Sequence, residues 1–197
     1  MIRRLRDFFI SLMLIILLMP ILVLISVAVY WIDGRPIFFR QLRAGKLGVP
    51  FYVIKYRTML NSSSDSTHLS SDTTRVTKLG KFLRATSLDE LPSLWNVLIG
   101  DMSLVGPRPL PVSYLPLYNK SQARRHNVKP GITGLAQVRG RNALSWEDRF
   151  NFDLYYVDNM SLMLDIKILL MTFKVVILRQ GINSSEDISM EIFKGND

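Results

Sequence analysis

The chain has 197 residues, no cysteine and a formal net charge of +9 at pH 7. The length suffices for one domain with a hydrophobic core plus an appendage, and the lack of cysteine excludes disulfides, thiol catalysis and cysteine-ligated metals. Residues 35–141 carry a net +12, against +1 before and −4 after them. This middle region is therefore the candidate binding region for a phosphorylated small molecule, an anionic lipid or nucleic acid, unless it is only a solvated basic face.

The N-terminal segment is free of charge over 24 residues, from Phe8 to Trp31. As one helix it would extend about 36 Å, enough to cross a hydrocarbon core of about 30 Å. Its length, and the lack of a small-residue cleavage site after it, argue against a cleaved signal peptide. Tyr30 and Trp31 suit the membrane–water interface.

Pro20 lies almost at the midpoint of this segment. Proline lacks a backbone donor and clashes with the preceding turn, so a kink or break is predicted there. Basic residues flank both ends of the segment, and the positive-inside rule favours keeping both in the cytoplasm. A helix that dips into the bilayer, breaks at Pro20 and returns satisfies both features. Spanning helices also tolerate proline, however, so the residues alone favour neither topology.

The pattern beyond this segment predicts a mixed α and β domain with short elements. β-forming residues and an intervening turn with two glycines predict strands at 36–39 and 50–56. The segment 61–74 is rich in Ser, Thr and Asp and is predicted to be a loop. A short helix is predicted over 78–83. A longer helix is predicted from Ser87, with a capping box, to Ile99.

The C-terminal part of the domain is predicted to be mainly helical. A short basic helix is expected at 122–127 and a short strand at 135–138. Ser145 and Ser161 are predicted N-caps of two further helices, which end near Tyr156 and Arg179. The last dozen residues, 186–197, are polar and are expected to form a loose tail.

Asp89 and Glu90 stand at the start of the predicted 87–99 helix. Adjacent carboxylates on a helix point in different directions, so one can serve a substrate while the other holds a cation or caps the helix. The helix dipole also stabilises acidic residues at this position, which makes a purely structural role an equal alternative. A carboxylate can also act as a covalent nucleophile toward phosphorus.

Arg108 stands between Pro107 and Pro109. The prolines stiffen the loop, so a planar guanidinium suited to phosphate oxygens is presented with little loss of entropy. With the carboxylate pair, the basic candidates suggest phosphoryl chemistry with Mg²⁺. The further phosphate-binding candidates are Lys55, Arg57, Arg84, Arg139 and Arg141. His68 and His126 form neither a metal pair nor a catalytic triad in the sequence pattern.

Several sequence blocks at fixed spacing resemble a known family. They are Lys55-Tyr56-Arg57-Thr58-Met59, Ser87-Leu88-Asp89-Glu90-Leu91-Pro92, Gly100-Asp101-Met102-Ser103, Gly106-Pro107-Arg108-Pro109, Pro130-Gly131-Ile132-Thr133-Gly134 and Gly140-Arg141-Asn142. On these motifs the chain resembles the monotopic phosphoglycosyl transferases, also called bacterial sugar transferases, over residues 1–185.

The resemblance implies an α+β architecture, with a re-entrant membrane helix broken at Pro20 in residues 1–34. A mostly helical cytoplasmic catalytic domain with a few short strands would follow over 35–185, with the flexible tail over 186–197. The expected location is the cytoplasmic face of a bacterial inner membrane. The phospholipid bilayer is then a partner, and the sequence leaves a homodimer open.

The resemblance also implies the chemistry. Asp89 would attack the β-phosphate of a UDP-sugar, release UMP and form a phosphosugar–aspartyl intermediate, from which polyprenyl (undecaprenyl) phosphate takes the phosphosugar. Glu90 would be the second catalytic acid, Mg²⁺ would be required at Asp89 and Glu90, and Lys55 and Arg108 would belong to the active site. Blocks such as Tyr114-Leu115-Pro116 are similar to those of enzymes that use UDP-bacillosamine derivatives.

Two other functions are compatible with parts of the pattern. A membrane-bound phosphatase or pyrophosphatase would use the same aspartyl chemistry with water as acceptor. A membrane-tethered adapter would bind nucleic acid or anionic lipid through the basic region. The adapter leaves the carboxylate pair and the stiff Pro-Arg-Pro loop unexplained, so we expect no nucleic-acid partner.

Overall fold

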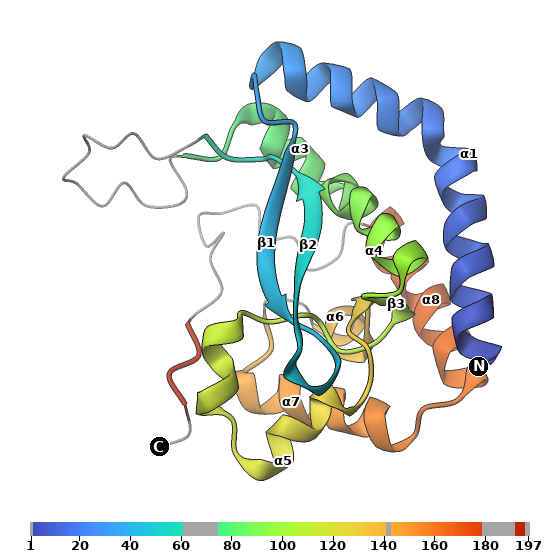
Figure 1. Ribbon diagram of the computed structural model, residues 1–197, viewed down its shortest axis with the longest axis vertical. Helices are drawn as coiled ribbons and strands as arrows, with labels where there is room; N and C mark the ends of the chain where they lie inside the picture. The colour runs from blue at the N-terminus through green and yellow to red at the C-terminus, as the bar shows by residue number, and fades with distance from the viewer. Residues whose placement is uncertain (1, 61–74, 141–142, 179–191, 196–197) are drawn as a thin grey trace.

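The computed structural model describes residues 2–60, 75–140, 143–178 and 192–195. The predicted loop at 61–74 and Arg141 lie outside the described residues. Within them, helices pack beside two small sheets, and the β1–β2 hairpin lies on one side of the molecule (Figure 1). The longer helices are α1 (Ile2–Ile32), α3 (Lys78–Ala85), α7 (Trp146–Asp158) and α8 (Leu162–Ile177). The shorter ones are η1 (Lys46–Gly48), η2 (Leu88–Ser93), α4 (Leu94–Ile99), η3 (Val112–Leu117), α5 (Lys120–Ala123), η4 (Arg124–Asn127) and α6 (Leu135–Arg139), where η marks a 3₁₀ helix.

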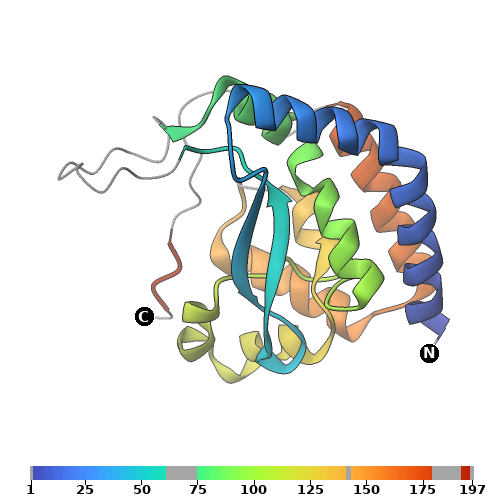
Figure 2. The same cartoon turned by 45° about the horizontal axis from the view of Figure 1, so that its top comes forward.

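The N-terminal helix α1 contains Pro20 and is bent, so that its two halves run in different directions (Figures 1 and 2). Among the described residues it is the one helix long and apolar enough to cross a membrane by length and composition. Its outward side is apolar along most of its length, which fits membrane association. Exposed side chains there include Phe9, Met13, Ile16, Leu17, Leu24 and Trp31.

The opposite side of α1 packs on the rest of the domain along both halves. Ile10, Leu14 and Leu18 pack against the main hydrophobic core, which includes Val97 of α4 and Ile168 of α8. Further along, Leu22, Ile25 and Val29 pack with Tyr56 and Leu83 in a second cluster. The helix therefore joins the domain through apolar burial at two places and presents the remaining apolar side outward.

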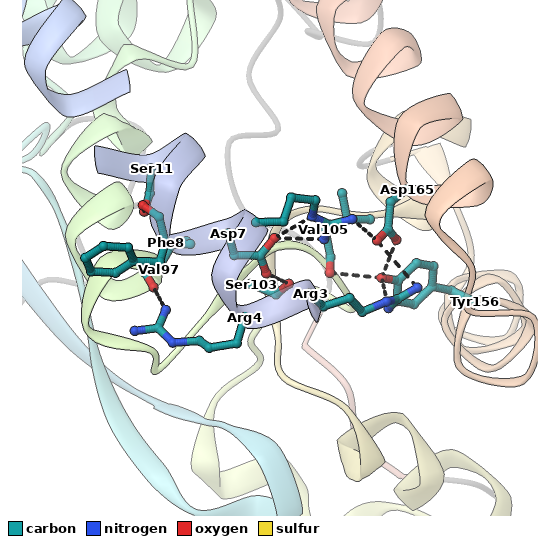
Figure 3. Close-up of polar contacts among 11 residues, drawn as sticks. Arg3, Arg4, Asp7, Phe8, Ser11, Val97, Ser103, Val105, Tyr156 and Asp165 are labelled. Carbon is teal, nitrogen blue, oxygen red and sulfur yellow. Dashed lines mark hydrogen bonds and ion pairs between the residues drawn. The ribbon is translucent and has the colours of Figure 1, made fainter. Parts of the chain in front are cut away.

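A buried polar network also fixes the start of α1 (Figure 3). Arg6 Nη1 donates to Asp165 Oδ2 of α8 over 2.6 Å, and Arg6 also pairs with Asp7. Asp7 accepts a hydrogen bond from Ser103 Oγ. Arg4 donates to the carbonyl oxygens of Val97 and Leu98, and its side chain thereby caps the C-terminal end of α4. These contacts fix the direction in which α1 leaves the domain.

Two pairs of strands form the sheets. Strands β1 (Phe38–Ala44) and β2 (Pro50–Tyr56) are antiparallel, with Phe39 opposite Lys55. The prediction for β2 is confirmed, whereas β1 begins and ends later than the predicted 36–39. Strands β3 (Ser103–Val105) and β4 (Gly131–Thr133) are parallel, and neither was predicted.

The strand predicted at 135–138 is wrong, because Leu135–Arg139 form helix α6. The strand in this region lies earlier, at Gly131–Thr133, where Gly131 comes so close to the Gly106 backbone that no Cβ would fit. Leu135, Ala136 and Val138 are buried from a helix instead, so the apolar residues that suggested a strand serve the core through a different backbone.

The capping box predicted at Ser87 is also wrong. Ser87 adopts a left-handed conformation, with φ 58°, and makes no side-chain cap. Residues 88–93 form the 3₁₀ helix η2 and only 94–99 are α-helical. Pro92 lies within this segment and supplies no amide hydrogen to a helical bond. The Ser93 hydroxyl donates to β2. Gly100 ends α4 at φ 99°, as predicted.

The helix predicted at 122–127 is instead divided between α5 and η4. Two predicted N-caps are confirmed. Ser145 Oγ accepts from the Asp148 amide over 3.0 Å, and Ser161 Oγ accepts from the Leu164 amide over 3.2 Å. Phe193, within the tail predicted to be loose, is buried among aromatic residues that include Tyr114 and Phe150.

Candidate active site

Separate elements bring one carboxylate and two cations together. Lys55 comes from β2, Glu90 from η2 and Arg108 from the loop after β3. Lys55 Nζ lies 2.6 Å from Glu90 Oε1, and Arg108 Nη2 lies 2.9 Å from the same oxygen. Glu90 is 22% exposed, so these pairs form at the border between interior and surface. The structure thus joins three of the residues that the sequence singled out.

Asn96 and Ser93 fix the position of Lys55 relative to Glu90. The buried Asn96 side chain accepts from the Ile54 amide over 3.1 Å and donates to the Tyr52 carbonyl over 2.8 Å. Ser93 Oγ donates to the Ile54 carbonyl over 2.8 Å. These three bonds tie β2 to the η2–α4 segment immediately before Lys55, so the ion pair rests on two elements that are joined to each other.

The Pro-Arg-Pro loop is held from behind by Arg125. Its Nη2 donates to the Arg108 carbonyl over 2.8 Å, and it forms a buried ion pair with Asp153 at 2.6 Å. Sequence reasoning missed both Arg125 and Asp153 as parts of the site. Arg125 and Asp153 lie far apart in the chain. Arg125 also stands in the basic run Arg124-Arg125-His126, where nothing in the sequence indicates that it is the buried arginine.

The two neighbouring carboxylates differ in ionisation. Burial and the charge of Glu90 raise the pKa of Asp89 to about 6, although Lys55, Arg108 and Arg84 act in the opposite direction. Burial would also raise the pKa of Glu90, but the charges and hydrogen bonds of Arg108 and Lys55 outweigh it and hold that pKa well below its usual range. Glu90 is therefore ionised at neutral pH, whereas Asp89 gains its proton when the pH falls to about 6.

A third cation, Arg43, lies beside the pair. It lines a small hollow together with Lys55, Glu90 and Arg108. Burial and the charge of Arg108 lower the pKa of Arg43 to about 10, which leaves it protonated at neutral pH. Sequence reasoning did not single out Arg43, since nothing in its strand distinguishes it from the nearby Arg40. The hollow thus offers several cations to an anionic group.

The other predicted phosphate-binding residues that the structure describes are Arg57, Arg84 and Arg139, and none of them lines the hollow at Glu90. Arg57 is buried and donates to the backbone carbonyls of Asp33 and Arg35, so it joins β2 to the end of α1. Arg84 Nε donates to Thr58 Oγ1 over 2.9 Å, and its charge acts on Asp89. Arg139 lines a different cavity.

His126 is also accounted for structurally. Its Nδ1 lies 3.0 Å from the Gly45 carbonyl, and burial lowers its pKa to about 4. A histidine that is uncharged at neutral pH and faces a backbone oxygen has a structural role here.

The fit of a magnesium ion depends on the substrate. The described residues contain no group of three or more His, Asp or Glu side chains that could hold a metal by themselves. Magnesium in phosphoryl-transfer enzymes is held by one or two carboxylates and completes its shell with water and phosphate oxygens. The Asp89–Glu90 pair fits that donor set, provided that a diphosphate supplies the other ligands.

The apolar bent helix on one side of the domain fits membrane association, and the carboxylate pair surrounded by cations is a candidate site for phosphorylated substrates. The family model described as Bacterial sugar transferase matches residues 1–179. The chain therefore belongs to the bacterial sugar transferase family.

Similar curated proteins agree with this family. The chain is 50% identical over 177 residues to the uncharacterized sugar transferase EpsL of Bacillus subtilis, covering 89% of this chain and 88% of EpsL. It is 44% identical over 180 residues to the UDP-glucose:undecaprenyl-phosphate glucose-1-phosphate transferase of Klebsiella pneumoniae, covering 86% of this chain but 39% of that protein. It is 36% identical to the exopolysaccharide production protein ExoY of Sinorhizobium fredii, covering 91% and 87% of the two chains.

Proposed function

We propose that this protein transfers a sugar phosphate from a UDP-sugar to polyprenyl phosphate and releases UMP, a membrane step of polysaccharide biosynthesis. Membership of the sugar transferase family supports the reaction class. The name of the Klebsiella relative, a UDP-glucose:undecaprenyl-phosphate glucose-1-phosphate transferase, supports the donor class and the acceptor. One observation assigns the reaction to particular residues. Glu90 is paired with Lys55 and Arg108, and the neighbouring Asp89 is half-buried and has a raised pKa.

The donor diphosphate binds at Lys55, Arg108 and Arg43. A dianionic diphosphate is repelled by two carboxylates, and these three cations offset that repulsion. Glu90 keeps Lys55 and Arg108 close together before the donor arrives. Asp89 and Glu90 are the residues that would hold Mg²⁺, which would supply further charge neutralisation to the bound diphosphate.

The transfer proceeds in two displacements. In the first, a carboxylate oxygen of ionised Asp89 forms a bond to the β-phosphorus, and the bond from that phosphorus to the bridging oxygen breaks. UMP leaves with the electron pair. In the second, a phosphate oxygen of polyprenyl phosphate bonds to the same phosphorus and the Asp89 carboxylate leaves. The products are UMP and a polyprenyl diphosphate sugar.

The acceptor is a lipid, so the reacting atoms must lie near the membrane interface. The proposed topology is a re-entrant α1 broken at Pro20, with both ends on the cytoplasmic side of the membrane. The bend in α1 and its outward apolar side support this arrangement. The absence of native cysteine allows a clean test, in which Ile2→Cys and Leu60→Cys are labelled from one side of a sealed vesicle. Labelling of the two positions from opposite sides would refute the topology.

The sugar is proposed to be an N-acetylated one of the UDP-bacillosamine type. Relatives named for glucose and galactose transfer make these two sugars the matched alternatives. A panel of the three UDP-sugars, scored by UMP release, identifies the donor by its kcat/KM.

The experiment that tests the reaction uses Asp89→Asn in the purified membrane protein. UMP release should fall by at least roughly a thousandfold, because the nucleophile is lost. Asp158→Asn is the matched control, since Asp158 is an exposed aspartate paired with Arg124. Undiminished release in Asp89→Asn would exclude Asp89 as the nucleophile.

A single-turnover measurement separates the transferase from a phosphatase. Without polyprenyl phosphate, the wild-type protein should release about one equivalent of UMP and then stop, because the aspartyl intermediate has no acceptor. Continued turnover without acceptor would favour hydrolysis. No release at all without acceptor would argue against a covalent intermediate.

A further inference from the structure

A second cavity, of about 410 Å³, lies between α6, α7 and α8. Its volume falls in the range of small-molecule sites in proteins, and none of its lining residues lines the hollow at Glu90. Leu135 and Ile168 are buried at its wall, and Phe152 and Met171 add further apolar surface. The cavity is thus mainly apolar and separate from the candidate active site.

Two cations line this otherwise apolar cavity. Arg139 ends α6 and Lys167 lies on α8, and both residues are exposed. The lining contains no Asp or Glu. Among the residues that the structure describes, neither cation has an ion-pair partner. Exposed cations beside an apolar wall are complementary to a molecule with an anionic head and an apolar chain.

The cavity borders the apolar side of the molecule. The α8 residues that do not face the cavity form an exposed apolar row, Met163, Ile166, Leu170 and Phe173. The Arg6–Asp165 ion pair joins α8 to the start of α1, and Figure 2 shows the two helices side by side. A lipid in the bilayer that surrounds α1 could therefore reach the cavity along α8.

We propose that this cavity binds an anionic phospholipid of the membrane. Its phosphate lies between Arg139 and Lys167, and an acyl chain fills the space against Leu135, Ile168 and Met171. The polyprenyl phosphate acceptor does not suit this place, because its phosphate must reach Asp89, and Arg139 and Lys167 line no part of the hollow there. The site would hold the domain against anionic membranes, in addition to the anchoring by α1.

The proposal is independent of the proposed reaction and is tested by binding. The full chain, purified in a neutral detergent, is titrated with dioctanoyl phosphatidylglycerol and, separately, with dioctanoyl phosphatidylcholine. The anionic lipid should raise the thermal unfolding midpoint as its concentration increases, since a ligand of the folded state stabilises it. The zwitterionic lipid should produce a much smaller rise.

The double variant Arg139→Gln/Lys167→Gln removes both charges from exposed positions. It should weaken phosphatidylglycerol binding by roughly 30-fold, since each basic residue near an anionic headgroup contributes about a fivefold factor. Lys174→Gln is the matched control. Lys174 is an exposed cation of the same helix and does not line the cavity, so its loss should leave the affinity within about twofold.

A second variant and two further probes separate the other occupants. Met171→Trp keeps both charges but fills the cavity, and should also weaken phosphatidylglycerol binding. Inorganic phosphate should produce no comparable rise in any variant, and an equal rise would reduce the site to a simple anion site. Farnesyl phosphate binding should survive the double substitution. Its loss there, or unchanged phosphatidylglycerol binding, would overturn the proposal.

Discussion

Arg125 donates a hydrogen bond from Nη2 to the backbone carbonyl of Arg108 over 2.8 Å. The same guanidinium is paired with the buried carboxylate of Asp153, so it has little freedom to move. Arg108 in turn reaches Glu90 at 2.9 Å. The buried Arg125–Asp153 ion pair thus holds the backbone of the Pro107–Pro109 loop. The Arg108 side chain points to Glu90 and can contact an anion there.

Arg125→Lys is expected to impair donor binding without removing the charge. A lysine can pair with Asp153 but cannot also donate through a planar fork to the Arg108 carbonyl. KM for the UDP-sugar should rise by roughly tenfold, with a smaller change in kcat, in a steady-state assay of UMP release. Arg124→Lys is the neighbouring control and should leave KM unchanged, because Arg124 is exposed.

Asp153→Asn is expected to destabilise the fold strongly. It would leave the Arg125 charge buried without its partner, which costs about 3–5 kcal/mol. Asp158→Asn breaks an exposed ion pair instead and should cost less than about 1 kcal/mol. Denaturant unfolding of both variants in one detergent gives the comparison. Equal stability of the two would show that the buried pair contributes no more than a surface pair.

The pH dependence of UMP release should report the ionisation of Asp89. A nucleophilic carboxylate must be deprotonated, and the pKa of Asp89 is raised to about 6. The rate should therefore rise with pH through about 6 and level off above it. Glu90 contributes no acidic limb in the same range, because its pKa is held well below its usual value.

Glu90→Gln should shift that acidic limb to lower pH. The substitution removes the negative charge that raises the pKa of Asp89 and frees Lys55 and Arg108 to act on it, so both effects lower the pKa. The remaining rate of the variant, followed between pH 5 and pH 8, gives the midpoint. A midpoint that stays near 6 would mean that burial alone sets the ionisation of Asp89.

Gly131→Ala is expected to disrupt the short parallel sheet. A Cβ at this position would collide with backbone atoms of Gly106 and Thr133, which cannot move independently of β3 and β4. The thermal unfolding midpoint should fall by several degrees or the protein should fail to accumulate. Gly140→Ala is the control, since its Cβ would meet only the Leu144 side chain, which can change rotamer.

Local sequence signals predicted the elements whose structure depends on neighbouring residues. Ser145 and Ser161 cap their helices because each hydroxyl accepts a hydrogen bond from the amide three residues further on. Gly100 ends α4 because glycine adopts a positive φ without steric cost. Signals failed where a distant partner decided the backbone. The 87–99 segment begins as a 3₁₀ helix tied to β2 through Ser93, and residues 135–138 are helical beside a strand that pairs with β3.

The sequence by itself determined the apolar N-terminal segment, the basic character of residues 35–141 and the residue types suited to phosphate chemistry. These follow from composition and from motifs that are contiguous in the chain. Only the tertiary structure decided which cations meet the carboxylates. Lys55 and Arg108 converge on one oxygen of Glu90, whereas Arg57 is used by backbone carbonyls and Arg139 lines another cavity. The physical reason is that a charge acts over a few ångströms, and the folded backbone sets those distances.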